Sequence, residues 1–199
     1  GQHFLHDPRV IGRILAAIDP RSDDALVEIG PGLGALTAPL LERVARVHVV
    51  ELDRDLAARL RAAHAPGRLV VHAQDALDFD FGALPAPLRV VGNLPYNIST
   101  PLLFRLAAVA PRLRDLHLML QREVVDRMVA SSSSPDYGRL SVTLQYRFEI
   151  AKLFEVGPGA FRPSPRVDSA VVRMVPRPAE ALAAHDAQVL ARVVTSAFT

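Results

Sequence analysis

The chain has 199 residues, of which 50% are apolar, and it carries a formal net charge of +2 and no cysteine. This length accommodates one full domain and part of a second, and the apolar content excludes a globally disordered chain. The lack of cysteine excludes disulfide frameworks, thiolate metal sites and a cysteine nucleophile. No apolar run reaches the length of a membrane span and no signal-peptide pattern opens the chain, so we expect a soluble cytoplasmic protein with no membrane partner.

The first part of the chain predicts alternating helices and strands. Asp7 can cap a helix that has Pro8 at its first position and apolar residues at helical spacing through Ile18. Short apolar runs then predict buried strands over 25–29, 47–52, 69–73, 88–92 and 116–120. Helices are expected after them, over 33–44, 53–63, 100–108 and from 121 to about 129. This alternation is typical of a parallel sheet with helices on both faces.

The remainder of the chain, from residue 131 on, predicts a different arrangement of elements. We expect a polar loop at 131–135, a helix over 137–146, β-like runs at 149–156 and 170–175, a linker at 176–178 and a helix over 187–197. The segment 157–169 between the two β-like runs is rich in proline, which predicts an antiparallel pair of strands joined by a stiff loop.

A glycine-rich turn follows the first predicted strand. The residues from Val27 to Gly34 have the pattern of a strand, a turn and a helix, and glycine allows the backbone of the turn to approach a ligand closely. The glycine spacing is GxGxG with a proline inside, one residue shorter than the GxGxxG of dinucleotide-binding turns. An ordinary strand-to-helix turn is the alternative interpretation. Ligands of parallel sheets bind past the carboxyl ends of the strands, where this turn lies.

One carboxylate lies at the end of the next predicted strand, and a second follows the strand after that. Glu51 can accept hydrogen bonds from both hydroxyls of a ribose. Asp75 can accept a hydrogen bond from the amino group of an adenine, and capping of a helix is an equally good interpretation of this residue. With the glycine turn, the two carboxylates predict an adenosine-containing ligand, and they leave nicotinamide dinucleotide and S-adenosylmethionine both open.

The most informative stretch is Gly92-Asn93-Leu94-Pro95-Tyr96, which follows the fourth predicted strand. The Asn93 side-chain oxygen and a neighbouring backbone carbonyl form a pair of acceptors, Pro95 stiffens the turn, and Tyr96 offers a flat face. This arrangement suits the exocyclic amine of adenine, whose delocalised lone pair needs polarisation and placement against an electrophilic methyl group. An Asx turn with a buried tyrosine is the alternative.

The sequence resembles the ribosomal RNA adenine dimethyltransferases that act on the small ribosomal subunit (KsgA type). The resemblance covers nearly the whole chain in order and rests on the stretches GQHFL at 1–5, EIGPGLG at 28–34, VELD at 50–53, QDA at 74–76, GNLPYNIST at 92–100, QREV at 121–124 and FRPSPRVDS at 161–169. It implies a Rossmann-like class I methyltransferase fold, with a mostly parallel seven-stranded sheet and helices on both faces. It also implies a methyltransferase domain at 1–176 and the truncated beginning of a C-terminal helical domain at 177–199.

The resemblance further implies that the chain uses S-adenosylmethionine to dimethylate two adjacent adenines near the 3′ end of small-subunit (16S) ribosomal RNA during ribosome biogenesis. Histidine at position 3 departs from the asparagine that is common in the family. The implied cofactor-binding residues are His3, Leu5, Gly30, Gly32, Glu51, Leu52, Asp75, Ala76 and Asn93. The implied catalytic residues are Asn93, Leu94, Pro95 and Tyr96.

Phe161 lies in the proline-rich segment, and with the resemblance we expect it to form, with Tyr96, a stacking site for an extruded adenine. Stacking of a base on an aromatic ring contributes ~1–3 kcal/mol, which is comparable to the few kcal/mol needed to unstack a nucleotide. Without the resemblance, a phenylalanine that fills the core below the loop is the more common arrangement.

Other features carry less information. The 7 histidines are scattered without metal-ligand spacing, so we expect no metal site. Each of several arginines is by itself more often a solvated surface charge than part of an RNA-binding track. The arginines that could form such a track are Arg9, Arg13, Arg122, Arg127, Arg139, Arg162 and Arg166.

Three alternative functions stay open at this point. The first is the antibiotic-resistance branch of the same fold, which modifies large-subunit ribosomal RNA, although Leu94 and the residues 167–169 favour the small-subunit branch. The second is an NAD-dependent oxidoreductase, which the short glycine spacing disfavours. The third is a ribosome-assembly factor that mainly binds the immature subunit. We expect the immature small ribosomal subunit as partner and a monomeric protein.

Overall fold

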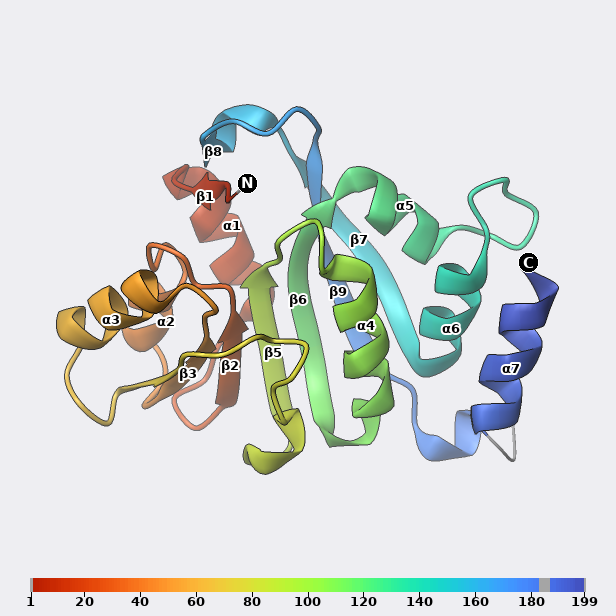
Figure 1. The fold of residues 1–199 in the computed structure, drawn as a ribbon, viewed down its shortest axis with the longest axis horizontal. Coiled ribbons are helices and arrows are strands. Elements are labelled where there is room, and N and C mark those ends of the chain that lie inside the picture. The colour runs from red at the N-terminus through yellow and green to blue at the C-terminus, as the bar shows by residue number, and fades with distance from the viewer. Residues whose placement is uncertain (1, 183–186, 199) are drawn as a thin grey trace.

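The computed structural model describes residues 2–182 and 187–198, and its centre is a seven-stranded sheet (Figure 1). Across the sheet the strands follow the order β4-β3-β2-β5-β6-β9-β7. Their bounds in that order are Leu69–His72, Val47–Val50, Ala25–Ile29, Leu88–Asn93, Leu113–Gln121, Ser169–Pro176 and Phe148–Val156. The strands from β4 to β6 are parallel, and β9 is antiparallel to both of its neighbours. The predicted α/β class with a mostly parallel seven-stranded sheet is confirmed.

Helices cover both faces of this sheet. The helices of the described residues are α1 (Pro8–Ile18), α2 (Thr37–Leu41), α3 (Arg54–Ala63), α4 (Ser99–Ala108), α5 (Arg122–Val129), α6 (Arg139–Arg147) and α7 (Ala187–Ala197), with 3-10 turns at Phe81–Ala83, Ala110–Arg112, Pro158–Ala160 and Ala179–Ala181. Helices α1, α2 and α3 share one apolar core layer, and α4, α5 and α6 share the other. Alternate strand residues point to opposite layers, since Leu26 joins the α1 layer while Val27 and Ile29 join the α4 layer.

A buried ion cluster holds α1 against the amino-terminal edge of the sheet. Arg89 of β5 is 3% exposed, and it pairs with Asp115 at 2.8 Å and with Asp24 at 2.6 Å. The same guanidinium donates to the carbonyl oxygen of Ile18, the last residue of α1. A cation at this position also interacts favourably with the helix dipole. The cluster lies at the end of the strands opposite to the glycine turn.

The predicted elements are present with small shifts in their bounds, except for one helix. Asp7 caps α1 as predicted, because its carboxylate accepts a hydrogen bond from the Arg9 N–H at 2.8 Å. The helix predicted over 33–44 is wrong in length, since only Thr37–Leu41 is helical. Gly34 has a φ of 85°, which lies outside the right-handed helical region, so the chain continues in turns until Leu36.

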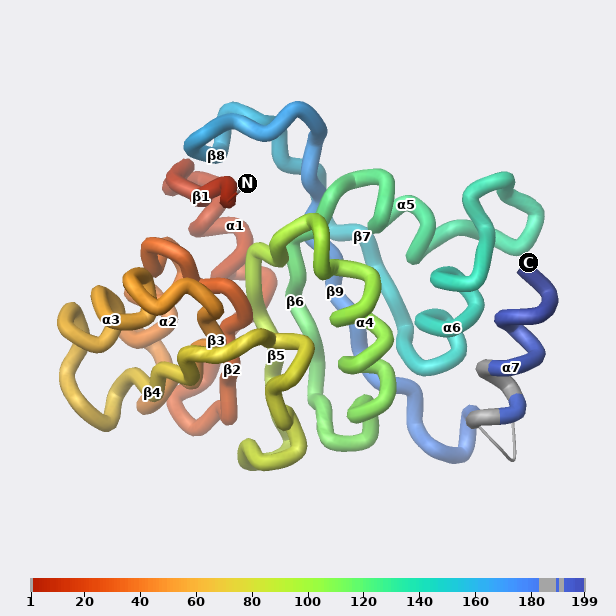
Figure 2. The backbone as a smooth tube through the Cα atoms, in the orientation of Figure 1, coloured from red at the N-terminus to blue at the C-terminus, as the bar shows by residue number. Residues whose placement is uncertain are grey.

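Two short strands that were not predicted join the N-terminal segment to the proline-rich segment. β1 (Phe4–Leu5) pairs antiparallel with β8 (Phe161–Arg162). The His6 N–H also donates to the Ala160 carbonyl oxygen at 2.9 Å. Figure 2 shows the chain between β7 and β9 arching over the N-terminal segment. A pairing between residues so far apart in the sequence leaves no trace in local periodicity.

The C-terminal helix α7 lies beside α6 at one edge of the molecule (Figure 1). The ring centre of Phe198 is 6.5 Å from that of Tyr137. β9 ends at Pro176, where the predicted first domain ends; the division of the chain into two domains stays a prediction. Within the part of the chain that the structure describes, no helix is long and apolar enough to cross a membrane.

Candidate active site

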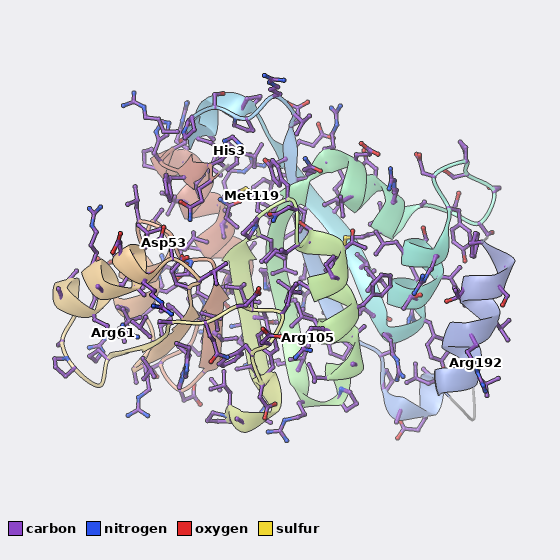
Figure 3. All side chains as sticks on the ribbon, in the orientation of Figure 1. His3, Asp53, Arg61, Arg105, Met119 and Arg192 are labelled. Carbon is purple, nitrogen blue, oxygen red and sulfur yellow. The ribbon has the colours of Figure 1, made fainter. Side chains whose placement is uncertain are left out.

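The carboxyl ends of β2, β3 and β5 meet at one edge of the sheet, and a cavity lies there. Its volume is about 90 Å³, several times the space that one buried water needs. Figure 3 shows His3 and Met119 toward this upper end of the sheet. The segments that line the cavity are far apart in the sequence, and they contribute Gln2–Leu5, Glu28, Gly30–Leu33, Ala35–Leu36, Glu51 and Asn93–Tyr96.

The glycine turn receives the N-terminal segment. Gly32 has a φ of 57°, in the left-handed region that favours glycine. A Cβ atom at Gly32 would lie only 2.9 Å from Cδ1 of Phe4, so the Phe4 ring can rest on this turn only because the side chain is absent. Gly30 donates its N–H to the Val50 carbonyl oxygen at 2.9 Å, which ties the turn to β3. Leu5, the next residue of β1, is buried at the wall of the cavity.

Glu51 lies at the cavity wall as predicted and is 4% exposed. Its Oε2 accepts a hydrogen bond from the Gly32 N–H at 3.1 Å, and its Oε1 accepts one from the Asp53 N–H at 2.9 Å. Each carboxylate oxygen has two lone-pair positions. The two backbone bonds therefore orient the carboxylate and leave acceptor capacity for hydroxyl groups of a ligand. The neighbouring Leu52 is 66% exposed and offers an apolar surface beside this carboxylate.

Asp75 lies outside the set of residues that line the cavity. Its Oδ1 accepts a hydrogen bond from the Leu77 N–H at 2.8 Å, and residues 76–78 form a turn. Asp75 therefore closes an Asx turn and caps no helix, so the alternative interpretation of this residue is wrong. The second carboxylate oxygen retains its acceptor positions. Ala76 is buried in the apolar layer on the α4 side. The roles of Asp75 and Ala76 in binding an adenine stay predictions.

Asn93 ends β5 with its carboxamide held in one orientation. Its Nδ2 donates to the backbone oxygen of His3 at 3.1 Å. The next residue, Leu94, donates its N–H to the Met119 carbonyl oxygen at 3.0 Å and buries its side chain in the core. Because Nδ2 is engaged, Oδ1 is the part of the carboxamide that is available to accept a hydrogen bond from a ligand.

Tyr96 and His3 stand next to each other at the cavity. Tyr96 is half-buried, and its hydroxyl lies 2.8 Å from Oγ of Ser169. The ring centres of His3 and Tyr96 are 5.8 Å apart, with 30° between the ring planes. His3 also donates from Nδ1 to the Pro163 carbonyl oxygen at 2.7 Å. The N-terminal segment, the turn after β5 and the proline-rich segment thus meet around one tyrosine.

The structure contradicts the prediction that Phe161 is a stacking surface. Phe161 is 3% exposed and belongs to the apolar core layer that contains Leu5 and Leu15. Its backbone is fixed by the pairing of β8 with β1. A ring that is enclosed in the apolar core offers no exposed face to a base, so the alternative interpretation, a phenylalanine that fills the core, holds in this structure.

Glu28 is a cavity residue to which the sequence analysis assigned no role. It is 2% exposed near the carboxyl end of β2, and its Oε2 accepts a hydrogen bond from the Thr37 hydroxyl at 2.6 Å. Burial raises the pKa of the Glu28 carboxyl from 4.5 to about 7, the Thr37 bond opposes this rise, and the negative charge of Glu51 adds to it. The sequence does contain a signal for this residue, which is a glutamate inside an otherwise apolar strand.

The arginines proposed for an RNA track have different surroundings. Arg122 and Arg127 form ion pairs with neighbouring acidic side chains. Arg13 and Arg139 lie over aromatic rings, with 3.8 Å and 5.4 Å between the guanidinium carbon and the ring centre. The exposed arginines at or near the β1–β8 pair are Arg9, Arg162 and Arg166. An RNA track through these residues stays a prediction.

Residues 2–182 and 187–198 hold no group of three or more side chains that could bind a metal ion. The sheet does bring two histidines together, because His48 of β3 and His72 of β4 stack with 3.1 Å between Nδ1 and Nε2. Burial lowers the pKa of both imidazoles, and nearby positive charge lowers them further. This pair depends on the strand register and was not predicted.

Comparisons with known proteins agree with one another on the family of this chain. A family model described as "Ribosomal RNA adenine dimethylase" matches residues 1–199. The ribosomal RNA small subunit methyltransferase A of Aromatoleum aromaticum is 62% identical over 198 residues, and the match covers 100% of this chain and 75% of that relative. The protein of the same name from Thiobacillus denitrificans is 58% identical over 198 residues, with 100% and 78% covered.

Two solved structures share the fold. A dimethyladenosine transferase from Plasmodium falciparum superposes with a TM-score of 0.82 at 29% identity, over 92% of this chain and 66% of that chain. The 23S rRNA methyltransferase ErmE superposes with a TM-score of 0.78 at 30% identity, over 96% of this chain and 77% of that chain. The expected methyltransferase fold is therefore confirmed.

Proposed function

The chain belongs to the ribosomal RNA adenine dimethylase family, and we propose that it transfers methyl groups from S-adenosylmethionine to the exocyclic amines of two adjacent adenines near the 3′ end of small-subunit ribosomal RNA. Family membership makes the chain a methyltransferase of ribosomal RNA adenine. One observation carries the proposed methyl transfer to an adenine amine: Asn93, Tyr96 and Glu51 line a single cavity.

The residues around the cavity fit the proposed cofactor. Glu51 is a buried carboxylate with acceptor capacity toward the cavity, which suits the two hydroxyls of a ribose. Gly30 and Gly32 line the same cavity, where the methionine part would lie, and His3 and Leu5 line it from the N-terminal segment. When bound, S-adenosylmethionine supplies an electrophilic methyl group on a sulfonium.

The protein's own contribution is to position and polarise the amine of the target base. Oδ1 of Asn93 accepts one N–H of that amine, and a backbone carbonyl of the same turn accepts the other. Both bonds draw the nitrogen lone pair out of conjugation with the ring. The Tyr96 ring stacks on the base and fixes its plane. No base is needed before the attack, since the amine loses its proton during or after methyl transfer.

The test of this proposal is Asn93→Ala. We expect turnover with immature small subunits to fall by about a hundredfold or more, as for other lost transition-state hydrogen bonds, while the calorimetric dissociation constant for S-adenosylmethionine changes much less. Asn97→Ala is the matched control, because it removes an exposed carboxamide from the same turn. Unchanged turnover in Asn93→Ala would refute the assigned role.

The small-subunit substrate is favoured over its alternatives by the degree of similarity. The two small-subunit relatives are 62% and 58% identical to this chain, whereas the 23S rRNA methyltransferase is 30% identical. Incubation with a labelled methyl donor and the RNA of each ribosomal subunit, followed by mapping of the labelled bases, distinguishes the two. Binding of NAD in place of S-adenosylmethionine would instead support the oxidoreductase alternative.

We further propose that the protein acts as a cytoplasmic monomer on an immature small ribosomal subunit. The support is its substrate class, because modification of small-subunit RNA takes place where subunits are assembled. A role as assembly factor can coexist with catalysis. Expression of the Asn93→Ala variant in cells that lack the active protein separates the two roles, since restored subunit maturation would show that binding alone suffices.

A further inference from the structure

We propose that Ser169 is a positioning residue for methyl transfer, because its hydroxyl holds the Tyr96 ring in the orientation that stacks on the target adenine. This inference rests on the proposed function and deepens it. Ser169 lies 73 positions after Tyr96 in the sequence, and its hydroxyl approaches the tyrosine hydroxyl to 2.8 Å. The two residues are brought together by the antiparallel strand β9, which runs beside the parallel part of the sheet.

The backbone of Ser169 is held by the two strands on either side of it. It is fully buried and is the first residue of β9, where it pairs with Gln121 of β6 on one side and with Val156 of β7 on the other. A residue held between two strands has little freedom of its backbone, so the position of its Oγ atom is fixed by the sheet. The tyrosine hydroxyl is thereby bound to an inner strand of the sheet.

The backbone on the N-terminal side of Tyr96 is also held in place. The preceding Pro95 has a fixed φ, and its carbonyl oxygen accepts a hydrogen bond from the Ser99 hydroxyl at 3.0 Å, at the start of α4. One step earlier, Leu94 is bonded to β6 through the Met119 carbonyl oxygen. With its backbone and its hydroxyl both fixed, the Tyr96 ring cannot turn about its first side-chain torsion without breaking the bond to Ser169.

A fixed ring matters for this reaction because the amine must be presented in line with an electrophile. The plane of a stacked base follows the plane of the ring beneath it, and small misplacements of reacting groups cost large factors in rate. Tyr96 is half-buried and borders the cavity, so it keeps a surface for a base while its hydroxyl is engaged. The burial of Phe161 removes the second stacking surface expected from the sequence, and the orientation of the base depends correspondingly more on Tyr96.

The first test is a double-mutant cycle with Ser169→Ala and Tyr96→Phe. Both variants remove the same hydrogen bond, one from each end, and Tyr96→Phe leaves the strand β9 unchanged. We expect kcat at saturating RNA to fall by about five- to tenfold in each variant, the value of one hydrogen bond, and no further in the double variant. The calorimetric dissociation constant for S-adenosylmethionine should stay within about twofold of wild type.

Ser164→Ala is the matched control, because it removes an exposed serine hydroxyl that binds the Pro158 carbonyl oxygen in the same proline-rich segment. It should leave kcat unchanged. Wild-type kcat in Tyr96→Phe would overturn the inference, and so would independent, multiplicative losses in the double variant. If the wild-type protein itself did not methylate adenine, the proposed function would be wrong instead, and the two failures are thereby distinguished.

The second test measures the surroundings and the mobility of the Tyr96 ring by NMR, without RNA or cofactor. The chain has 3 tyrosines, at positions 96, 137 and 146, so the resonances of fluorotyrosine-labelled protein can be assigned with single Tyr→Phe variants. In Ser169→Ala we expect the resonance of Tyr96 to shift and to change its relaxation, and those of Tyr137 and Tyr146 to stay in place. An unchanged Tyr96 resonance would show that Ser169 does not restrain the ring.

Discussion

Replacement of Glu28 by glutamine is predicted to make the protein more stable at alkaline pH. The Glu28 carboxyl is fully enclosed, and burial, with the negative charge of Glu51, raises its pKa from 4.5 to about 7 despite the hydrogen bond from Thr37. Between these two pH values the folded protein binds a proton that the unfolded chain has lost. Stability therefore falls as the pH rises from 4.5 to about 7 and stays low above that.

The size of the effect follows from the same two values. A rise in pKa from 4.5 to about 7 corresponds to roughly 3 kcal/mol of lost stability at pH 8. Glutamine has nearly the same shape, accepts the Thr37 hydrogen bond through Oε1 and carries no charge. At pH 8 we expect the free energy of unfolding of Glu28→Gln to exceed that of the wild type by up to about 3 kcal/mol, or about 6–12 °C in Tm for a chain of this length.

Thermal and urea denaturation of both proteins from pH 5 to pH 8.5 measures this difference. The stability of Glu28→Gln relative to the wild type should grow from pH 5 to about pH 7 and level off above that. Glu42→Gln, which replaces an exposed glutamate at the end of α2, measures the effect of removing one negative charge from the surface. A stability difference between Glu28→Gln and wild type that is the same at every pH would refute the reasoning.

Three further predictions concern other parts of the molecule. Gly92→Ala places a Cβ atom 2.4 Å from the Ile29 carbonyl oxygen of the neighbouring strand, so we expect about 3 kcal/mol or more of lost stability in urea denaturation. A urea midpoint near that of the wild type would contradict the close approach of β2 and β5. Asp115→Asn leaves the buried Arg89 guanidinium partly unpaired and should lower the free energy of unfolding by about 3 kcal/mol in the same measurement. A stability like that of the wild type would show that the ion cluster does not support the fold. Glu51→Gln removes the charged acceptor from the cavity wall, so the calorimetric dissociation constant for S-adenosylmethionine should rise about 10- to 100-fold; an unchanged constant would argue against the ribose contact.

Much of the fold could be predicted because its signals are local. Most residues of the inner parallel strands are apolar and buried, and Asp7 marks the beginning of α1 by capping its first N–H groups. Alternation of these elements predicts the parallel sheet, and the rule that ligands bind past the carboxyl ends of the strands places Gly30, Glu51 and Asn93 at one edge. In the structure, all three of these residues line one cavity.

The features that were wrongly predicted or not predicted depend on contacts between distant residues. Phe161 looks like an exposed ring on a proline-rich loop, and only the pairing of β8 with β1 shows that it points into the core. The pairing of His48 with His72 and the bond between Tyr96 and Ser169 are of the same kind. No periodicity within a single segment encodes such contacts.

The sequence by itself determined the class of fold, the edge of the sheet that holds the cavity and the chemical type of the groups placed there. Those properties follow from hydrophobic periodicity and from residue types at the ends of strands, which each segment carries alone. The tertiary structure decided which groups are free to act: it left Oδ1 of Asn93 available, enclosed Glu28 and Phe161, and fixed Tyr96 against Ser169. Burial and hydrogen bonding are properties of the packed chain, because they depend on which distant segments come to lie against one another.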